Sequence, residues 1–126
     1  MKGATPARCV MVVEDEMFVA MLVEDILSNA GYRVIKAARV DKALEMAAGN
    51  EPIDAALLDI NLNGVEVFPV AIKLREMGVP FVFASGYGRE GLPADFSDAP
   101  VLQKPYLPDA LRDAVAALLG PAPATG

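Results

Sequence analysis

The chain has 126 residues, of which 54% are apolar and 22% are charged, and a length of this order suits a single domain with an ordinary hydrophobic core. Its formal net charge is −6 and it has no dense basic stripe, which argues against direct binding to nucleic acid. The sequence contains no histidine, and this excludes a histidine phosphocarrier, a Ser-His-Asp hydrolase and a histidine-ligated zinc site within the chain.

Apolar runs of strand length alternate with stretches of helical pattern along the chain. The expected strands cover residues 8–13, 32–37, 53–58, 79–84 and 101–103. The expected helices cover residues 16–30, 40–48, a stretch within 65–77, and 108–119. Gly31 and Gly78 follow two of these helices as stop signals, and Pro108 suits the first turn of the last helix. Alternating βα units predict a doubly wound α/β fold, in which helices cover both faces of a parallel sheet.

The segment between the fourth and fifth strands breaks this alternation. A helix is expected between Ser85 and Ala99, but the segment contains Gly88, Gly91 and Pro93. In a helix interior each glycine costs about 1 kcal/mol relative to alanine, and proline costs about 3 kcal/mol. We therefore expect either a short or irregular fourth helix, or a loop that packs without regular structure.

One domain is expected over residues 8–119, between an N-terminal extension (1–7) and a flexible C-terminal tail (120–126). No apolar run approaches the roughly 20 residues that span a bilayer, and the first residues lack the apolar core of a signal peptide. Cys9 is the only cysteine, so no intramolecular disulfide can form, and it is more readily explained as a small core residue than as a reactive thiol. We expect a protein of the reducing cytoplasm with no membrane partner.

Polar residues that suit phosphoryl chemistry stand at the ends of four expected strands. Glu14 and Asp15 follow the first strand, Asp59 the third, Ser85 the fourth and Lys104 the fifth. Because parallel strands end at one edge of the sheet, these side chains are expected to meet there. Neighbouring strands lie about 4.8 Å apart, so the carboxylates repel one another, and a divalent cation relieves that repulsion.

We expect this cation to be Mg²⁺, which prefers oxygen ligands. Asp15, Asp59 and a backbone carbonyl, that of Asn61, would supply three oxygens, and Glu14 could hold a metal-bound water. Asp59 could then act as a nucleophile toward a phosphoryl group and form an aspartyl phosphate.

Two further side chains would assist that reaction. Lys104 would neutralise charge on the oxygens of the transferred group, and the Ser85 hydroxyl would donate to one of them. The new dianion would pull on the loops after the fourth and fifth strands, which offers a switch.

Four of these residues also have a purely structural interpretation. Asp15 suits a helix N-cap, Asp59 can open a turn with Asn61, Ser85 suits a Ser-Gly turn, and Lys104 can be an ordinary surface residue. The required residue types at four strand ends favour the functional interpretation of the set.

As a set, these motifs resemble the receiver domains of response regulators in two-component signalling. The resemblance covers about residues 8–119 and implies a flavodoxin-like sheet with strand order 2-1-3-4-5. It implies that Glu14 and Asp15 are the acidic pair, Asp59 the phosphoacceptor, Ser85 the hydroxyl residue and Lys104 the lysine of the family. It also implies a cis peptide bond before Pro105.

Two features refine this resemblance. Many receivers carry a Tyr or Phe three residues before the lysine that rotates inward on phosphorylation, and Val101 stands there, so this rotation cannot be the switch. Residues 79–88 resemble the FATGUY subgroup, with Ser85 in place of its threonine, and members of that subgroup are frequently free-standing with an altered fourth helix. We therefore expect ordering of residues 86–99 to carry the signal, with Tyr87 as a candidate participant.

The first helix is more apolar than one buried face requires. The residues expected to face the core are Phe18, Leu22, Val23 and Ile26. A second set with i, i+3, i+4 spacing is expected to face outward: Met17, Ala20 and Met21. Receivers generally dock their histidine kinase or phosphotransfer protein with this helix, so the second set is the expected docking surface, unless these residues are buried within the domain.

The function that follows is a single-domain response regulator that accepts a phosphoryl group from a phosphohistidine partner and signals to a downstream protein partner. It would be a switch rather than an enzyme, with at most self-phosphorylation and autodephosphorylation. The alternative is a phosphorylation-independent interaction module with the same fold. A flavodoxin-type FMN protein would need a phosphate-cradling loop where Glu14, Asp15 and Glu16 stand, and a phosphatase or phosphomutase with an aspartyl nucleophile would need a second aspartate where Asn61 stands.

Overall fold

Five parallel strands form the central sheet in the computed structural model, which describes residues 7–62, 64–86 and 92–120. The strands are β1 (Cys9–Val13), β2 (Arg33–Ala37), β3 (Ala55–Asp59), β6 (Phe81–Ser85) and β7 (Val101–Gln103). Their order across the sheet is β2-β1-β3-β6-β7, and every neighbouring pair is parallel. Counted along the chain within this sheet, the order is 2-1-3-4-5, so the predicted flavodoxin-like fold is confirmed.

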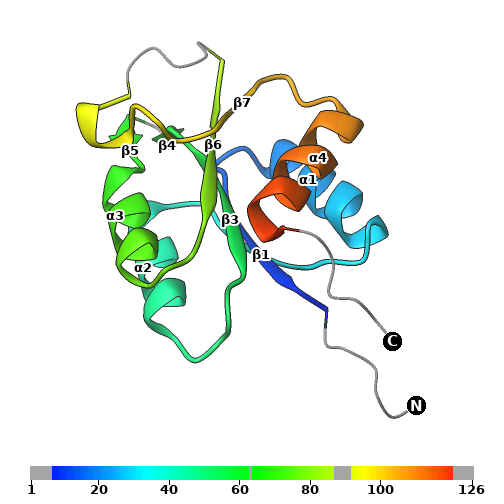
Figure 1. Cartoon of the computed structure of the whole chain (residues 1–126), viewed down its shortest axis with the longest axis horizontal. Coiled ribbons are helices and arrows are strands. Elements are labelled where there is room, and N and C mark those ends of the chain that lie inside the picture. Colours follow the sequence, from blue (N-terminus) through cyan, green and yellow to red (C-terminus); the bar gives the residue numbers. More distant parts are fainter. Residues whose placement is uncertain (1–6, 63, 87–91, 121–126) are drawn as a thin grey trace.

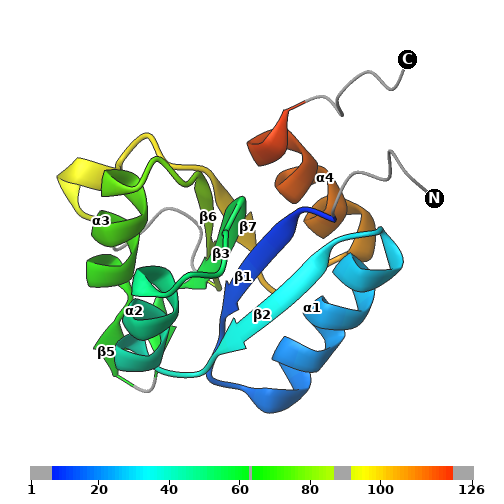
Figure 2. The same ribbon diagram turned by 90° about the horizontal axis from the view of Figure 1, so that it is seen from below.

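Helices cover both faces of the sheet. They are α1 (Met17–Asn29), α2 (Val40–Ala48), α3 (Phe68–Glu76) and α4 (Pro108–Leu119). Figures 1 and 2 show α1 and α4 on one face, and α2 and α3 on the other. Among the residues described, no helix is long and apolar enough to cross a membrane.

The three central strands are buried on both faces, as their nearly continuous apolar sequences require. Alternate residues of each strand point to opposite sides. Met11, Leu58 and Phe83 belong to the core beneath α2 and α3, whereas Val12 and Leu57 belong to the core beneath α1 and α4. These two cores hold the strands in register, and the register fixes where the strand ends meet.

A short hairpin separates β3 from α3. Strands β4 (Asn61–Leu62) and β5 (Val65–Glu66) pair antiparallel, with Leu62 opposite Val65. This pairing leaves a two-residue Asn-Gly connection, and Gly64 has φ +85°, a conformation that favours glycine. The third helix therefore lies within the predicted stretch 65–77 but begins only at Phe68.

The segment after β6 is irregular, as predicted. Its described part, residue 86 and residues 92–99, contains a single helical turn, the 3₁₀ helix η1 (Ala94–Phe96). Tyr87, Gly88 and Gly91 lie outside the described residues. The predicted N-terminal extension and C-terminal tail also lie outside them, apart from Ala7 and Gly120.

The sequence-based division of α1 into two faces is wrong at three positions. Ala20 is only 8% exposed and faces the core, whereas Phe18 is 84% and Leu22 is 50% exposed. The reason is the helical period of about 100° per residue, which places Ala20 on the same side as Val23 and Leu27 and opposite Phe18 and Leu22. The exposed apolar residues of α1 are Met17, Phe18, Met21 and Leu22.

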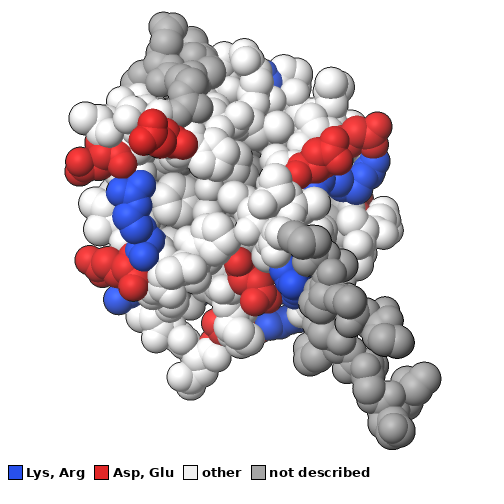
Figure 3. Space-filling model, viewed as in Figure 1, with Lys and Arg blue, Asp and Glu red and all other residues white. Residues whose placement is uncertain are grey.

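Charges on the outside of the domain are mixed. Figure 3 shows basic and acidic side chains close together at the left, at the right and below the centre of one face, with uncharged surface between these groups. At the edge of the sheet where the strands begin, Arg8 Nη1 donates to the Leu119 carbonyl over 2.8 Å, so the start of β1 is tied to the end of α4.

Candidate functional site

Three carboxylates meet at the edge where the strands end. Glu14 and Asp15 directly follow β1, and Asp59 is the last residue of β3, the neighbouring strand. One carboxylate oxygen from each lies within 4.8 Å of the others. Glu14 and Asp59 are buried and Asp15 is half-buried, so the cluster is largely shielded from water. The register of β1 and β3 thus brings together the acidic residues that the sequence singled out.

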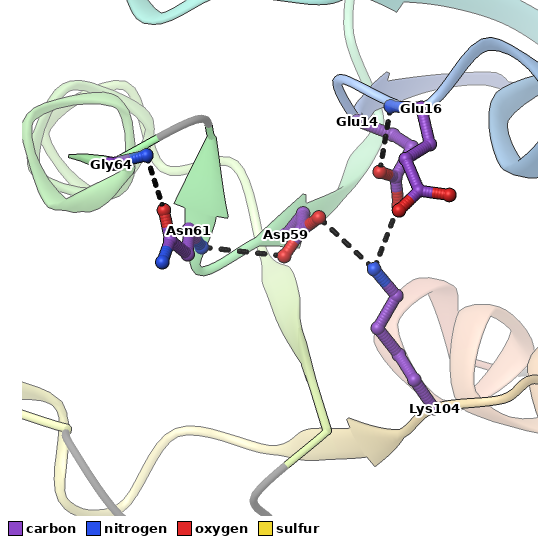
Figure 4. Close-up of polar contacts among 6 residues, drawn as sticks. All are labelled: Glu14, Glu16, Asp59, Asn61, Gly64 and Lys104. Carbon is purple, nitrogen blue, oxygen red and sulfur yellow. Dashed lines mark hydrogen bonds and ion pairs between the residues drawn. The ribbon is translucent and has the colours of Figure 1, made fainter.

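Lys104, which follows the edge strand β7, bridges two of these carboxylates (Figure 4). Its Nζ donates to Asp59 Oδ2 over 3.0 Å and to Glu14 Oε1 over 3.1 Å. Burial alone would lower the pKa of Lys104, but the contacts with Asp59 and Glu14 raise it above its usual value. Lys104 follows β7, and the Lys104–Pro105 peptide bond is cis, as the family resemblance implies.

Glu14 is the acid of the cluster whose surroundings favour its neutral form. Burial is the main reason that its pKa is raised from 4.5 to about 7, and the negative charge of Asp59 adds to the shift. The Glu16 N–H, which donates to Glu14 Oε2 over 3.1 Å, and the ammonium of Lys104 oppose it (Figure 4). A cation beside a buried carboxylate with a raised pKa stabilises the charged form of that carboxylate more than it would for an exposed one.

The loop after β3 is organised around Asp59. The Asn61 N–H points to Asp59 Oδ1 over 3.3 Å, and Asn61 Oδ1 accepts the Gly64 N–H over 2.7 Å (Figure 4). The hairpin is closed by the Val67 N–H, which donates to the Ile60 carbonyl over 3.0 Å. The side chain of Asn61 therefore shapes the turn, while its backbone remains next to the phosphoacceptor candidate.

Ser85 lies at the same edge of the sheet. It is the buried last residue of β6, one position beyond Ala84, which pairs with Asp59. Its carbonyl accepts the Lys104 N–H over 3.0 Å, which links the ends of β6 and β7. The predicted site residues thus come from four strand ends and lie at one edge of the sheet.

Tyr106 is a neighbour of the site that the sequence analysis did not single out. It lies between β7 and α4, partly buried against the core beneath α1 and α4. Burial raises the pKa of its phenol above the usual value, and the negative charges of Glu14 and Asp59 contribute to the shift. The one sequence feature that could have pointed to Tyr106 as a neighbour of the site is its position two residues after Lys104.

The donor chemistry of this site fits Mg²⁺. Carboxylate oxygens are hard ligands, which Mg²⁺ and Ca²⁺ prefer, and the described part of the chain offers no sulfur or imidazole ligand here. The three clustered acids carry more negative charge than Lys104 alone can neutralise, so a divalent cation suits the electrostatics as well.

Residues 10–116 match the family model of the response regulator receiver domain. The chain belongs to this family. Receiver domains are phosphoacceptor switches of two-component systems, and the expectation drawn from the strand-end motifs is thereby confirmed at this level.

Solved receiver structures resemble the whole described domain. The solution structure of SdrG from Sphingomonas melonis Fr1 has a TM-score of 0.79 and 38% sequence identity, and the match covers 93% of this chain and 100% of SdrG. The BeF₃-activated conformation of SdrG from Pseudomonas melonis Fr1 has a TM-score of 0.77 and 39% identity, covering 92% of this chain and 100% of that one.

A curated relative is longer than this receiver domain. The uncharacterized transcriptional regulatory protein YrkP of Bacillus subtilis (strain 168) is 30% identical over 116 residues, which cover 87% of this chain and 48% of YrkP. This chain therefore spans about half the length of YrkP, and the likeness concerns the receiver part.

Proposed function

We propose that this receiver domain accepts a phosphoryl group on Asp59 from a phosphohistidine partner, with Mg²⁺ as cofactor, in the cytoplasm. The single observation that carries the proposal is the position of Asp59. It is a buried carboxylate at the shared strand edge, paired with Lys104 and clustered with Glu14 and Asp15. The domain then acts as a phosphoacceptor switch that signals through protein contacts.

The transfer is a nucleophilic displacement at phosphorus. A carboxylate oxygen of Asp59 forms the new O–P bond while the P–N bond of the phosphohistidine breaks. The electron pair of that bond returns to the imidazole, which takes a proton from solvent. Lys104 moves from its bridge between carboxylates to the charge of the incoming phosphoryl oxygens, and the Ser85 hydroxyl donates to one of them. Mg²⁺, held by Asp15, Asp59 and the Asn61 carbonyl with Glu14 beside them, would neutralise the remaining charge.

Binding of beryllofluoride, a stable phosphoryl mimic, tests this proposal. The related SdrG has been solved in a BeF₃-activated conformation, which supports the choice of probe. We expect Mg²⁺-dependent binding to the unmodified chain, with amide NMR shifts around Ser85 and Lys104, and none to Asp59→Ala. Asp113→Ala removes an exposed acid of α4 and serves as the matched control. No binding to the unmodified chain would favour the phosphorylation-independent module instead.

We propose further that the phosphohistidine partner docks on the exposed apolar face of α1. This face comprises Met17, Phe18, Met21 and Leu22, which corrects the set predicted from the sequence by replacing Ala20 with Phe18 and Leu22. It begins directly after the acidic loop, so a helical partner seated on it could present its phosphohistidine to Asp59. Flexible methionines suit such an adaptable contact.

A pair of matched variants tests this docking surface. Met21 and Ile72 are both 49% exposed, but Ile72 lies on α3 across the sheet. We expect Met21→Glu to slow phosphotransfer from the partner while phosphorylation by acetyl phosphate is unchanged, and Ile72→Glu to affect neither. Equal loss of both reactions in Met21→Glu would contradict the docking role.

The output of the switch is proposed to pass through residues 86–99. Val101 stands where many receivers have a rotating aromatic residue, and it is partly buried against the core beneath α2 and α3. This supports a route through the irregular segment rather than through a side-chain rotation at Val101. Amide exchange of residues 92–99 should change when beryllofluoride binds; an unchanged exchange pattern would argue against this route.

A further inference from the structure

The aromatic side chain of Phe96 attaches the described residues 92–99 to the rest of the domain. Phe96 of η1 is 2% exposed and enters a cluster with the rings of α3 and β6. Its centroid lies 5.7 Å from the nearly parallel ring of Phe68, 5.4 Å from Phe83 and 6.0 Å from Phe81. Around Phe96 the segment is exposed on both sides, from residue 93 to 95 and from 97 to 98.

Arg75 of α3 holds the same turn from outside. Its guanidinium carbon lies 4.3 Å from the centroid of the Phe96 ring, within range of a cation–π contact. Its Nη1 also donates to the Asp95 carbonyl over 3.1 Å. Arg75 therefore contacts both the ring and the backbone of η1. We call the contacts of Arg75 and Phe96 the latch.

The backbone N–H groups at η1 contribute less than the latch to holding this turn against α3 and β6. Three backbone hydrogen bonds among the described residues are local: the Phe96 N–H donates to the Pro93 carbonyl, the Ser97 N–H to the Ala94 carbonyl, and the Ala99 N–H to the Phe96 carbonyl. Leu92 and Ala99 make smaller apolar contacts with the core. A short turn whose backbone N–H groups bond locally depends on its side-chain contacts to stay closed.

The ring of Phe96 packs against α3 and β6, and both of these elements lead to the phosphoacceptor site. Phe68 is the first residue of α3, directly after the hairpin that leaves Asp59, and Val67 is bonded to Ile60. Phe83 lies two residues before Ser85 on β6. A shift of either the hairpin or the end of β6 therefore changes the packing around Phe96.

We propose that the latch holds residues 92–99 in the arrangement that belongs to unphosphorylated Asp59, and that phosphorylation releases it. This inference rests on the proposed function. In the latched arrangement Lys104 bridges Glu14 and Asp59. A phosphoryl group draws Lys104 and Ser85 toward new oxygens, which moves the end of β6 under Phe96. Because such coupling is reciprocal, a weaker latch must favour the phosphorylated form.

The affinity for beryllofluoride with Mg²⁺ is the test, measured by amide NMR titration on the full chain. Arg75→Ala removes the cation–π contact and the hydrogen bond, and Phe96→Leu keeps an apolar side chain but removes the ring. We expect both variants to bind about three- to tenfold more tightly, and the amides of residues 94–99 to exchange faster without ligand. Lys73→Ala removes a charge from the same helix without touching the latch, and its affinity should match that of the unmodified chain.

The outcomes separate the latch from the proposed function. Faster exchange in Arg75→Ala with unchanged or weaker beryllofluoride binding would show a loosened turn with no effect on the site, and would overturn the latch. The same gain in beryllofluoride affinity in Lys73→Ala would show that the effect comes from net charge. That result would also overturn the latch. Failure of the unmodified chain to bind beryllofluoride refutes the proposed function itself, and the latch falls with it.

Discussion

Replacement of Glu14 by glutamine should make the metal-free domain more stable at pH 8. Glu14 is 4% exposed, and burial is the main cause of its raised pKa. A shift from 4.5 to about 7 corresponds to about 3 kcal/mol of cost for ionising this carboxyl in the folded state. Glutamine has nearly the same shape and can still accept the Glu16 N–H, but it loses the ionic contact with Lys104. We therefore expect a net gain of about 1–2 kcal/mol, or about 4–8 °C in Tm.

The gain should depend on pH in a defined direction. Because the folded pKa of Glu14 is raised, the stability tied to this carboxyl is fully present below pH 4.5 and is lost as the pH rises through 7. The unmodified chain and Glu14→Gln should therefore be closer in stability at pH 5 than at pH 8. Urea unfolding followed by circular dichroism in EDTA measures this difference at both values.

Magnesium should reduce the stability advantage of Glu14→Gln over the unmodified chain. A cation that binds only the folded state stabilises it by mass action, and Glu14→Gln gives up one carboxylate of its site. Added Mg²⁺ should raise the stability of the unmodified chain more than that of the variant, and Glu76→Gln, an exposed acid of α3, should behave as the unmodified chain. A variant that is less stable at pH 8 in EDTA, or equally stabilised at both pH values, would refute the assignment of a costly buried charge.

Substitutions at three other places test the site, the hairpin and the core. Lys104→Ala should tighten Mg²⁺ binding, because the ammonium of Lys104 competes for the same carboxylates. The same variant should be phosphorylated more slowly by acetyl phosphate. Weaker Mg²⁺ binding by calorimetry would contradict the first expectation. Gly64→Ala should cost about 1–2 kcal/mol in urea unfolding, because φ is +85° there, whereas Gly86→Ala, where no neighbour lies within 4 Å, should cost less than about 0.5 kcal/mol. Phe83→Ala should cost about 3–5 kcal/mol and half-exposed Ile72→Ala much less; similar losses would contradict the burial of Phe83.

The sheet and the site were predictable because strand patterns are strong in this chain. Runs such as 10–13 and 55–58 are apolar at every position, which is typical of strands buried on both faces. Once their order is that of the family, Asp59 at the end of β3 and Lys104 after β7 lie at the same edge of the sheet, with the end of β6 between them. The contact of Lys104 with both Glu14 and Asp59 needed coordinates, because the sequence does not report side-chain geometry.

The faces of α1 were harder to predict for a physical reason. This helix is apolar nearly all round, so the pattern of apolar residues does not single out one buried stripe. Ala20 is buried, whereas Phe18 is exposed. Position around the helix, rather than polarity, distinguishes the two faces, since Leu27 is buried and Leu22 is 50% exposed although both are leucine.

The hairpin did have a sequence signal. Asn-Gly between Leu62 and Val65 is typical of a two-residue hairpin turn, but strands of only two residues each are too short to show an alternating pattern. The latch had no such signal, since Arg75 and Phe96 are 21 positions apart on elements whose packing a single sequence does not reveal.

The bond between Arg8 and Leu119 also has a practical meaning for building chimaeras. It brings the two ends of the folded domain within hydrogen-bonding reach of each other, at the side of the sheet farthest from Asp59. A short linker could therefore join them, and new ends could be opened elsewhere, with little loss of the fold. By the same geometry, a reporter or a second module attached at either end would leave the acidic cluster and the outer face of α1 open to a partner.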